Sequence, residues 1–141
     1  RVVSNFILQA LSHQSLGLYG DGSQTRSFCY ISDQVEGLVR LAEGDYSGPV
    51  NIGNDQEVSI LELARMVISL SGSAGGIVQL PLPRDDPRRR RPDISLARRL
   101  LGWSPQVSLE QGLKQTIDYF RGALAEHPRY SDARQREAGA I

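Results

Sequence analysis

The sequence has few of the residues that build disulfide frameworks or metal sites. Cys29 is its only cysteine, so no internal disulfide can form and a cysteine-based zinc site is excluded. The two histidines, His13 and His127, lie far apart and have no third ligand nearby in the sequence. We therefore expect no bound metal and a reducing compartment.

Long apolar runs and an excess of charge are also missing. No stretch approaches the about 18 consecutive apolar residues of a transmembrane helix, and the N-terminus does not resemble a signal peptide. The 16 basic and 16 acidic residues cancel, which removes the electrostatic basis for nucleic acid or an anionic membrane as the main partner. We predict a cytoplasmic protein with no membrane segment in this chain and no nucleic-acid partner.

The 141 residues, of which 40% are hydrophobic, suffice for one globular core. The chain opens at Arg1 inside an apolar-periodic segment without a preceding helix cap, so we expect a fragment of a larger protein. Apolar content falls from about Glu126 onward. We predict one domain over residues 1–125, followed by a mobile tail over 126–141.

Helical and strand signals are both present along the chain. Apolar spacing predicts helices over 2–12, 33–43, 60–72, 95–101 and from 109 onward. Three of them have capping residues: an N-cap at Ser32, a capping box of Ser59 and Glu62, and an N-cap at Ser108. Short β-prone segments predict strands over 16–22, 27–31, 49–53 and 77–82, with a loop over 81–92. This order is typical of a mixed α/β fold that is too small for a complete doubly wound sheet.

A glycine-containing turn between two predicted strands carries residues that suit a phosphate ligand. Gly20 and Gly22 allow the backbone to approach a ligand closely, and Gln24 and Arg26 project from the same loop. Arginine matches phosphate oxygens with two parallel hydrogen bonds. From the residues alone, a surface turn whose arginine pairs with a nearby carboxylate is the favoured interpretation.

The segment L-Y-G-D-G-S-Q-T-R-S-F-C-Y-I-S-D at Leu18–Asp33 resembles the nucleotide-sugar epimerases and dehydratases of the extended short-chain dehydrogenase/reductase family. The opening R-V-V-S-N-F-I-L-Q-A-L and the Q-T-R-x-F wording are most similar to the UDP-glucuronate decarboxylases, or UDP-xylose synthases. R-R-P-D-I at Arg90–Ile94, L-L-G-W-S-P at Leu100–Pro105 and L-E-Q-G at Leu109–Gly112 follow in the family's order. With this resemblance, ligand binding becomes the favoured interpretation of the glycine turn.

The resemblance implies the C-terminal substrate-binding lobe of such an enzyme, with the NAD-binding Rossmann lobe missing from this chain. It implies that the parent enzyme uses NAD to oxidise UDP-glucuronate at C4, releases CO2 from the β-keto acid as an enolate forms, and reduces the product to UDP-xylose. It also implies a UDP-sugar as the ligand of this lobe, a homodimeric parent, and either a cytoplasmic or a membrane-anchored Golgi location.

The family's functional residues carry over onto matching positions. Arg1 is implied to be catalytic, holding the substrate carboxylate and assisting proton delivery as CO2 leaves. The implied substrate-binding residues are Val2, Val3, Ser4, Asn5, Tyr19, Gly20, Gln24, Arg26 and Arg90. Within the run Arg88–Arg91, the family's spacing selects Arg90 for the diphosphate and leaves the other three peripheral.

Other conspicuous side chains fit structural roles better. Phe28 and Cys29 lie on a β-prone segment and are predicted to pack. Trp103 is predicted to pack at a helix end, and Asp33 to be a helix N-terminal acid instead of a catalytic base. Tyr19 fits either a nucleotide base or the closing of a strand.

The sequence lacks the family's cofactor and proton-transfer motifs. Thr25 stands where G-D-G-S-Q-T needs its third glycine, and S-G-S-A-G-G follows a predicted helix instead of a strand. No tyrosine is followed four residues later by a lysine. We therefore expect the isolated chain to be inactive. Two alternatives stay open: a dTDP-glucose 4,6-dehydratase or nucleotide-sugar 4-epimerase lobe, and a non-catalytic nucleotide-sugar binding module.

Overall fold

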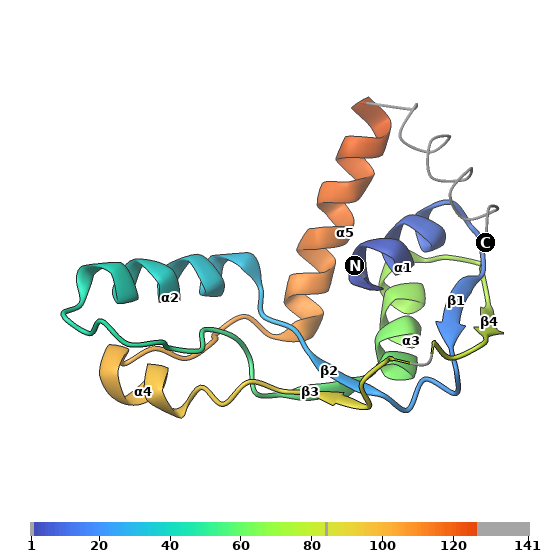
Figure 1. Cartoon of the computed structure of the whole chain (residues 1–141). Coiled ribbons are helices and arrows are strands. Elements are labelled where there is room, and N and C mark those ends of the chain that lie inside the picture. The colour runs from blue at the N-terminus through green and yellow to red at the C-terminus, as the bar shows by residue number, and fades with distance from the viewer. Residues whose placement is uncertain (1, 84, 127–141) are drawn as a thin grey trace.

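The computed structural model describes residues 2–83 and 85–126 of the chain (Figure 1). Its elements are α1 (Val2–Leu11), β1 (Leu16–Tyr19), β2 (Thr25–Ser27), α2 (Ile31–Glu43), β3 (Glu57–Ser59), α3 (Ile60–Ser71), β4 (Ile77–Leu80), β5 (Arg89–Arg90), α4 (Ser95–Leu101) and α5 (Leu109–Glu126). The mixed α/β class with short strands is confirmed. Apart from Glu126, the predicted tail over 126–141 lies outside the described residues.

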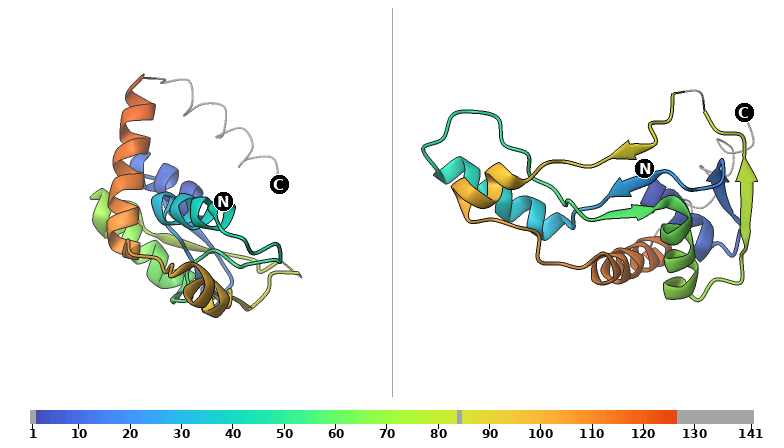
Figure 2. Two further views of the ribbon diagram at one scale, coloured as in Figure 1. Left: turned by 90° about the vertical axis from the view of Figure 1, so that its left-hand side faces the viewer. Right: turned by 90° about the horizontal axis from the view of Figure 1, so that it is seen from below.

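The elements form two groups joined by short strands (Figures 1 and 2). At one end α1, α3 and α5 pack together beside β1, which pairs in parallel with β4. At the other end α2 and α4 lie side by side. Between them β2 is the central strand of a three-stranded sheet, antiparallel to β3 and parallel to β5.

The hydrophobic core lies where α1, α3 and α5 meet β1. Its buried members are Phe6, Ile7, Ala10, Leu16, Leu18, Ile60, Leu63, Ala64, Val67, Leu113 and Ile117. In the last helix Leu113 and Ile117 are buried, while Leu109 and Phe120 pack against the core. The apolar spacing of these helices therefore gives one core at the end of the molecule that carries β1.

Predicted helix ends are mostly confirmed by their capping contacts. The Ser59 side chain accepts from the backbone N–H of Glu62 at 3.1 Å, and the Glu62 carboxylate accepts from the backbone N–H of Ser59 at 3.1 Å. Gly72 ends α3 in the left-handed conformation at φ 68°, as a helix-terminating glycine should. Ser108 caps α5 by accepting from the backbone N–H of Gln111 at 3.2 Å.

The prediction of a strand over 27–31 and an N-cap at Ser32 is wrong. The strand is Thr25–Ser27, α2 begins at Ile31, and its N-cap Tyr30 makes no side-chain capping bond. The Tyr30 ring faces Gly112 of α5, and its hydroxyl donates to Gln115 Oε1 at 2.8 Å. Packing against α5 therefore overrides the local β-propensity of this segment.

The strand predicted over 49–53 is also wrong. In this segment the Asn51 side-chain amide donates to the carbonyl of Asp93 at 3.1 Å. Gly53 packs against the Pro92 ring. Side-chain hydrogen bonds and packing thus hold this extended segment in place of a backbone ladder.

The strands predicted over 16–22 and 77–82 are shorter than expected. The first ends at Tyr19 because Gly20 turns to a positive φ of 66°. The second ends at Leu80, directly before Pro81, which has no N–H to donate. The segment 81–92, predicted to be a loop, contains the two-residue strand β5.

Asp33 and Trp103 connect α2 to the segment between α4 and α5. The Trp103 indole N–H donates to the Asp33 carbonyl at 3.0 Å. The Asp33 carboxylate accepts from the backbone N–H groups of Gln106 and Val107 at 3.0 and 2.8 Å. A Cβ at Gly37 would lie 3.0 Å from the Trp103 ring, so glycine allows this close approach. The packing role predicted for Trp103 is confirmed, and Asp33 occupies the first turn of α2 as predicted.

Replacing Asp33 by alanine should destabilise the chain by roughly 1–3 kcal/mol, because two backbone N–H groups lose their acceptor. Asp33→Asn retains one side-chain carbonyl oxygen and should cost less. Urea unfolding of both variants measures the difference. An unchanged midpoint for Asp33→Ala would show that this carboxylate does not hold the connection.

Candidate functional site

The pairing of β2 with β5 brings two predicted site residues together. Arg26 and Arg90 are partners in this parallel pair, although 64 positions separate them in the sequence (90 − 26). Partnered residues of parallel strands project toward the same face of a sheet. The structure therefore places both guanidinium-bearing residues side by side on one face.

The Arg26 side chain is anchored by a carboxylate. Its Nη2 donates to Asp86 Oδ1 at 2.5 Å, and its Nη1 donates to the carbonyl of Thr25 at 2.8 Å. The side chain is only 17% exposed. The carboxylate pairing considered from the sequence is thus present. A guanidinium carries five N–H donors, so Arg26 keeps donors for a second anion.

Arg90 has a different environment. Arg90 is exposed, and its guanidinium makes no hydrogen bond or ion pair within the described part of the chain. Its backbone carbonyl accepts from the Ser27 hydroxyl at 3.5 Å. Asp86 balances Arg26, whereas no carboxylate among the described residues pairs with Arg90.

The opposite face of the same strands holds a cluster around Glu57. The Glu57 carboxylate accepts from the Thr25 hydroxyl at 2.7 Å and from Arg89 Nε and Nη2 at 2.9 and 2.5 Å. The Arg89 and Thr25 hydrogen bonds hold the pKa of Glu57 below its ordinary value of 4.5. Arg89, expected to be peripheral, therefore belongs to a defined cluster.

The glycine turn after β1 is braced from inside. The Gln24 amide, only 9% exposed, donates to the carbonyl of Tyr19 at 2.9 Å, so its nitrogen points into the turn. Gly20 and Gly22 both have positive φ, and the Leu82 side chain lies over Gly20. The Tyr19 residue is 46% exposed at the end of β1. The turn thus exposes Tyr19, whereas Gly22 is buried against Leu18 and Leu61 and Gln24 stabilises the turn from inside.

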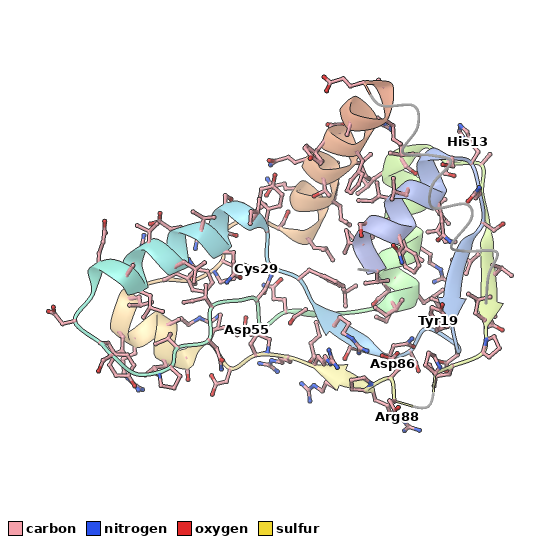
Figure 3. The ribbon with its side chains drawn as sticks, turned by 45° about the horizontal axis from the view of Figure 1, so that its top comes forward. His13, Tyr19, Cys29, Asp55, Asp86 and Arg88 are labelled. Carbon is pink, nitrogen blue, oxygen red and sulfur yellow. The ribbon has the colours of Figure 1, made fainter. Side chains whose placement is uncertain are left out.

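A hollow of about 450 Å³ lies between this turn and the loop that leads to β5. It is lined by Asp21, Ser23, Gln24, Leu82, Asp86 and Arg88. Figure 3 shows Tyr19, Asp86 and Arg88 gathered where β1 leads into β2, far from His13. The hollow therefore adjoins the Arg26–Asp86 pair.

The first turn of α1 carries the remaining predicted site residues. Arg1 lies outside the described residues. Val2 and Val3 are partly buried and pack against the hydrophobic core, Ser4 is partly buried, and Asn5 is exposed. Figure 1 shows the N-terminal end of α1 above β2. The structure thus gives the two valines a packing role and places them on the side of the molecule that holds the core.

No sequence pattern predicted a role for Asp86 and Glu57, the two carboxylates that hold arginines of this region. Asp86 belongs to an acidic pair just before the arginine run, and that charge alternation is the one signal that could have suggested a partner. Glu57 is separated from Arg89 by 32 positions, and only the strand order β3-β2-β5 brings them together.

The described residues offer few other reactive or ligating groups. Burial raises the pKa of the Cys29 thiol, with a contribution from nearby Asp33, which favours the unreactive protonated form. No three or more His, Cys, Asp or Glu side chains in residues 2–83 and 85–126 form a group that could hold a metal ion. No helix of the described part combines the length and apolarity needed to span a bilayer.

Strand-to-helix connections are where a dinucleotide cofactor would be sought. In the described part, β2, β3 and β5 each lead into a helix, and none of these three connections contains a glycine. The turn with Gly20 and Gly22 joins β1 to β2, and the turn over 72–76 joins α3 to β4. A dinucleotide diphosphate needs a glycine turn that leads from a strand into a helix N-terminus.

Known proteins similar in sequence include UDP-glucuronic acid decarboxylases. The chain is 57% identical to UDP-glucuronic acid decarboxylase 1 of Xenopus tropicalis over 127 residues, which is 90% of this chain and 30% of the relative. It is 52% identical to UDP-glucuronic acid decarboxylase 2 of Arabidopsis thaliana over 121 residues, 86% of this chain and 27% of the relative. The chain thus spans about 30% of the length of the curated relatives it matches.

Solved structures with this fold include nucleotide-sugar epimerases. UDP-glucose 4-epimerase of Thermotoga maritima with UDP-glucose aligns with a TM-score of 0.84 at 31% identity, over 88% of this chain and 40% of that chain. UDP-glucuronic acid 4-epimerase of Bacillus cereus, in complex with UDP-glucuronic acid and NAD, aligns with a TM-score of 0.81 at 34% identity, over 87% and 40%. The family model described as GDP-mannose 4,6 dehydratase matches residues 1–116. The chain therefore belongs to the GDP-mannose 4,6-dehydratase family of extended short-chain dehydrogenases/reductases and is a homologue of the UDP-glucuronic acid decarboxylases.

Proposed function

We propose that the chain is the C-terminal, nucleotide-sugar binding lobe of an NAD-dependent enzyme that decarboxylates UDP-glucuronate to UDP-xylose. The observation that carries this proposal is the 57% identity to a UDP-glucuronic acid decarboxylase over 90% of the chain. Identity to the two epimerase structures is 31% and 34% over similar lengths. The sequence is thus markedly more similar to the decarboxylases.

The face with Arg26 and Arg90 suits the diphosphate of a nucleotide sugar. A diphosphate carries about two negative charges, and guanidinium groups bind such oxygens with strong, paired hydrogen bonds. The two arginines lie on adjacent, registered strands, and no carboxylate among the described residues pairs with Arg90. In this proposal Arg26 and Arg90 bind the diphosphate, while Tyr19 and Gly20 line the neighbouring part of the nucleotide site.

The carboxylate of the sugar needs a cation of its own. Arg1, with Val2, Val3, Ser4 and Asn5 behind it, supplies one at the chain start. In this proposal the Arg1 guanidinium holds the carboxylate with charge-assisted hydrogen bonds and assists proton delivery as CO2 leaves. An enzyme that acts on an uncharged hexose would have no such need.

NAD is assigned to a part of the enzyme outside this chain. When bound, NAD supplies the oxidation at C4 that makes loss of CO2 possible. The residues described here do not fit its diphosphate, because no glycine turn leads from a strand into a helix. The role proposed for this lobe is therefore to bind and orient the nucleotide sugar.

Product analysis tests this function. The full-length enzyme that carries this sequence, incubated with UDP-glucuronate and NAD, should release CO2 and form a UDP-pentose in equal amounts. One structural neighbour in complex with UDP-glucuronic acid is a 4-epimerase, so a UDP-hexuronate epimer that keeps its carboxylate is the alternative product. Formation of that epimer without CO2 would replace the decarboxylase by the epimerase.

A further inference from the structure

We propose that Glu57 and Arg89 form a positioning pair whose ion pair fixes the register of β5 and directs Arg90 to the face that carries Arg26. This inference rests on the proposed function, in which Arg90 binds the diphosphate. Glu57 and Arg89 themselves act from the opposite face of the strands and do not touch the substrate.

The strand β5 is too short to define its own register. It consists of Arg89 and Arg90 and pairs with β2 at the edge of the sheet. A slip of one residue turns every side chain of a strand to the other face. Because Arg88–Arg91 is a run of four identical side chains, a slipped strand would still present arginines, and the run itself does not specify which one lies beside Arg26.

The Glu57 cluster fixes the register that β5 does not define by itself. The Glu57 side chain reaches past β2 and accepts from the Thr25 hydroxyl at 2.7 Å. Its Oε1 accepts from Arg89 Nε at 3.0 Å and its Oε2 from Arg89 Nη2 at 2.5 Å. Two parallel hydrogen bonds from a planar guanidinium have strict geometric demands. The carboxylate is 18% exposed, so it is partly shielded from competing water. One side chain from each of the three strands is thereby tied together.

The alternation of side chains along a strand transmits this constraint to the other face. With Arg89 held on the Glu57 face, the next residue must project from the opposite face, where Arg26 lies. Arg90 is therefore held on the face that carries Arg26, although it has no side-chain partner of its own among the described residues. The pair around Arg89 positions Arg90 and leaves its guanidinium available for an anion.

The direction in which Glu57→Ala changes UDP affinity distinguishes a positioning role from a simple charge effect. Removing the Glu57 carboxylate removes a negative charge near an anion site, and by Coulomb's law alone this should strengthen UDP binding. Loss of the β5 register predicts the opposite result. In the full-length enzyme, Glu57→Ala should weaken UDP binding about fivefold to twentyfold. This loss is smaller than the about tenfold to hundredfold loss expected for Arg90→Ala, because the Arg90 guanidinium is still present.

Calorimetric titration with UDP tests the pair, with Asp85→Ala as a matched control. Asp85 is exposed, has no side-chain partner in the described part of the chain, and precedes the same arginine run. Its removal should leave UDP affinity within about twofold, as is usual for an unpartnered surface charge. Glu57→Ala combined with Arg90→Ala should bind UDP within about twofold of Arg90→Ala alone, because Glu57 acts through Arg90.

A second pair of variants keeps the charge and the fold. Arg89→Lys preserves the positive charge but loses the two-pronged contact with Glu57, so UDP binding should weaken about threefold or more. Arg91→Lys, at an exposed position outside the hollow, should change it less than about twofold. If Arg90→Ala weakens binding but Glu57→Ala and Arg89→Lys do not, the positioning pair is refuted and the proposed function stands. If Arg90→Ala itself has no effect, the proposed site is wrong.

Discussion

Replacing Arg26 or Arg90 by alanine in the full-length enzyme should weaken UDP binding about tenfold to a hundredfold. A hydrogen bond between charged groups contributes roughly 1.5–3 kcal/mol, and every 1.4 kcal/mol corresponds to about tenfold in affinity. Arg26→Ala has a further cost, because Asp86 loses its 2.5 Å partner and is left as an unpaired carboxylate beside the diphosphate. Isothermal titration calorimetry with UDP measures both losses.

The neighbouring arginines provide the control for this prediction. Arg88 and Arg91 are exposed and make no side-chain hydrogen bond or ion pair with other described residues, so alanine at either position should change UDP affinity by less than about threefold. Equal, small losses for all four single variants would mean that the region acts as diffuse positive charge. In that case the assignment of Arg26 and Arg90 to the diphosphate would be wrong.

The isolated 141-residue chain should neither bind NAD nor release CO2 from UDP-glucuronate. None of its described strand-to-helix connections contains a glycine, so no helix N-terminus is prepared for the cofactor diphosphate. Its one lysine, Lys114, follows Glu110 by four residues and pairs with it at 2.6 Å, so it cannot serve a tyrosine four residues upstream. Without the cofactor the C4 ketone does not form, and the carboxylate has no electron acceptor beside it.

Fluorescence titration with NADH and a labelled-CO2 release assay measure these two properties of the isolated chain. The full-length enzyme under the same conditions is the positive control and should show both. Detectable turnover by the pure chain would refute the proposal that catalysis needs a cofactor-binding part outside this chain.

Local sequence signals predicted the helices of this fold well. The capping box of Ser59 and Glu62 and the terminating Gly72 give the limits of α3, because these ends depend on residues within one helical turn. The N-terminus of α2 was misplaced for the opposite reason. Tyr30 is set by contacts with Gly112 and Gln115, more than eighty positions away, and no local pattern carries that information.

The same difference between local and long-range information applies to the candidate site. Family spacing selected Arg26 and Arg90, and the strand register brings these two residues together. The carboxylates that hold the neighbouring side chains were not predicted, because Asp86 lies 60 positions from Arg26 and Glu57 lies 32 from Arg89. Long-range pairing in short strands leaves no periodic trace in a single sequence.

A crystal structure of the full-length enzyme with UDP bound would show directly where the diphosphate lies. We predict that the diphosphate lies on the face of β2 and β5 that carries Arg26 and Arg90, with guanidinium nitrogens about 2.7–2.9 Å from its oxygens. Glu57 and Arg89 should remain paired on the opposite face. A diphosphate bound elsewhere, with Arg26 and Arg90 both exposed to solvent, would contradict the assignment of this chain to nucleotide-sugar binding.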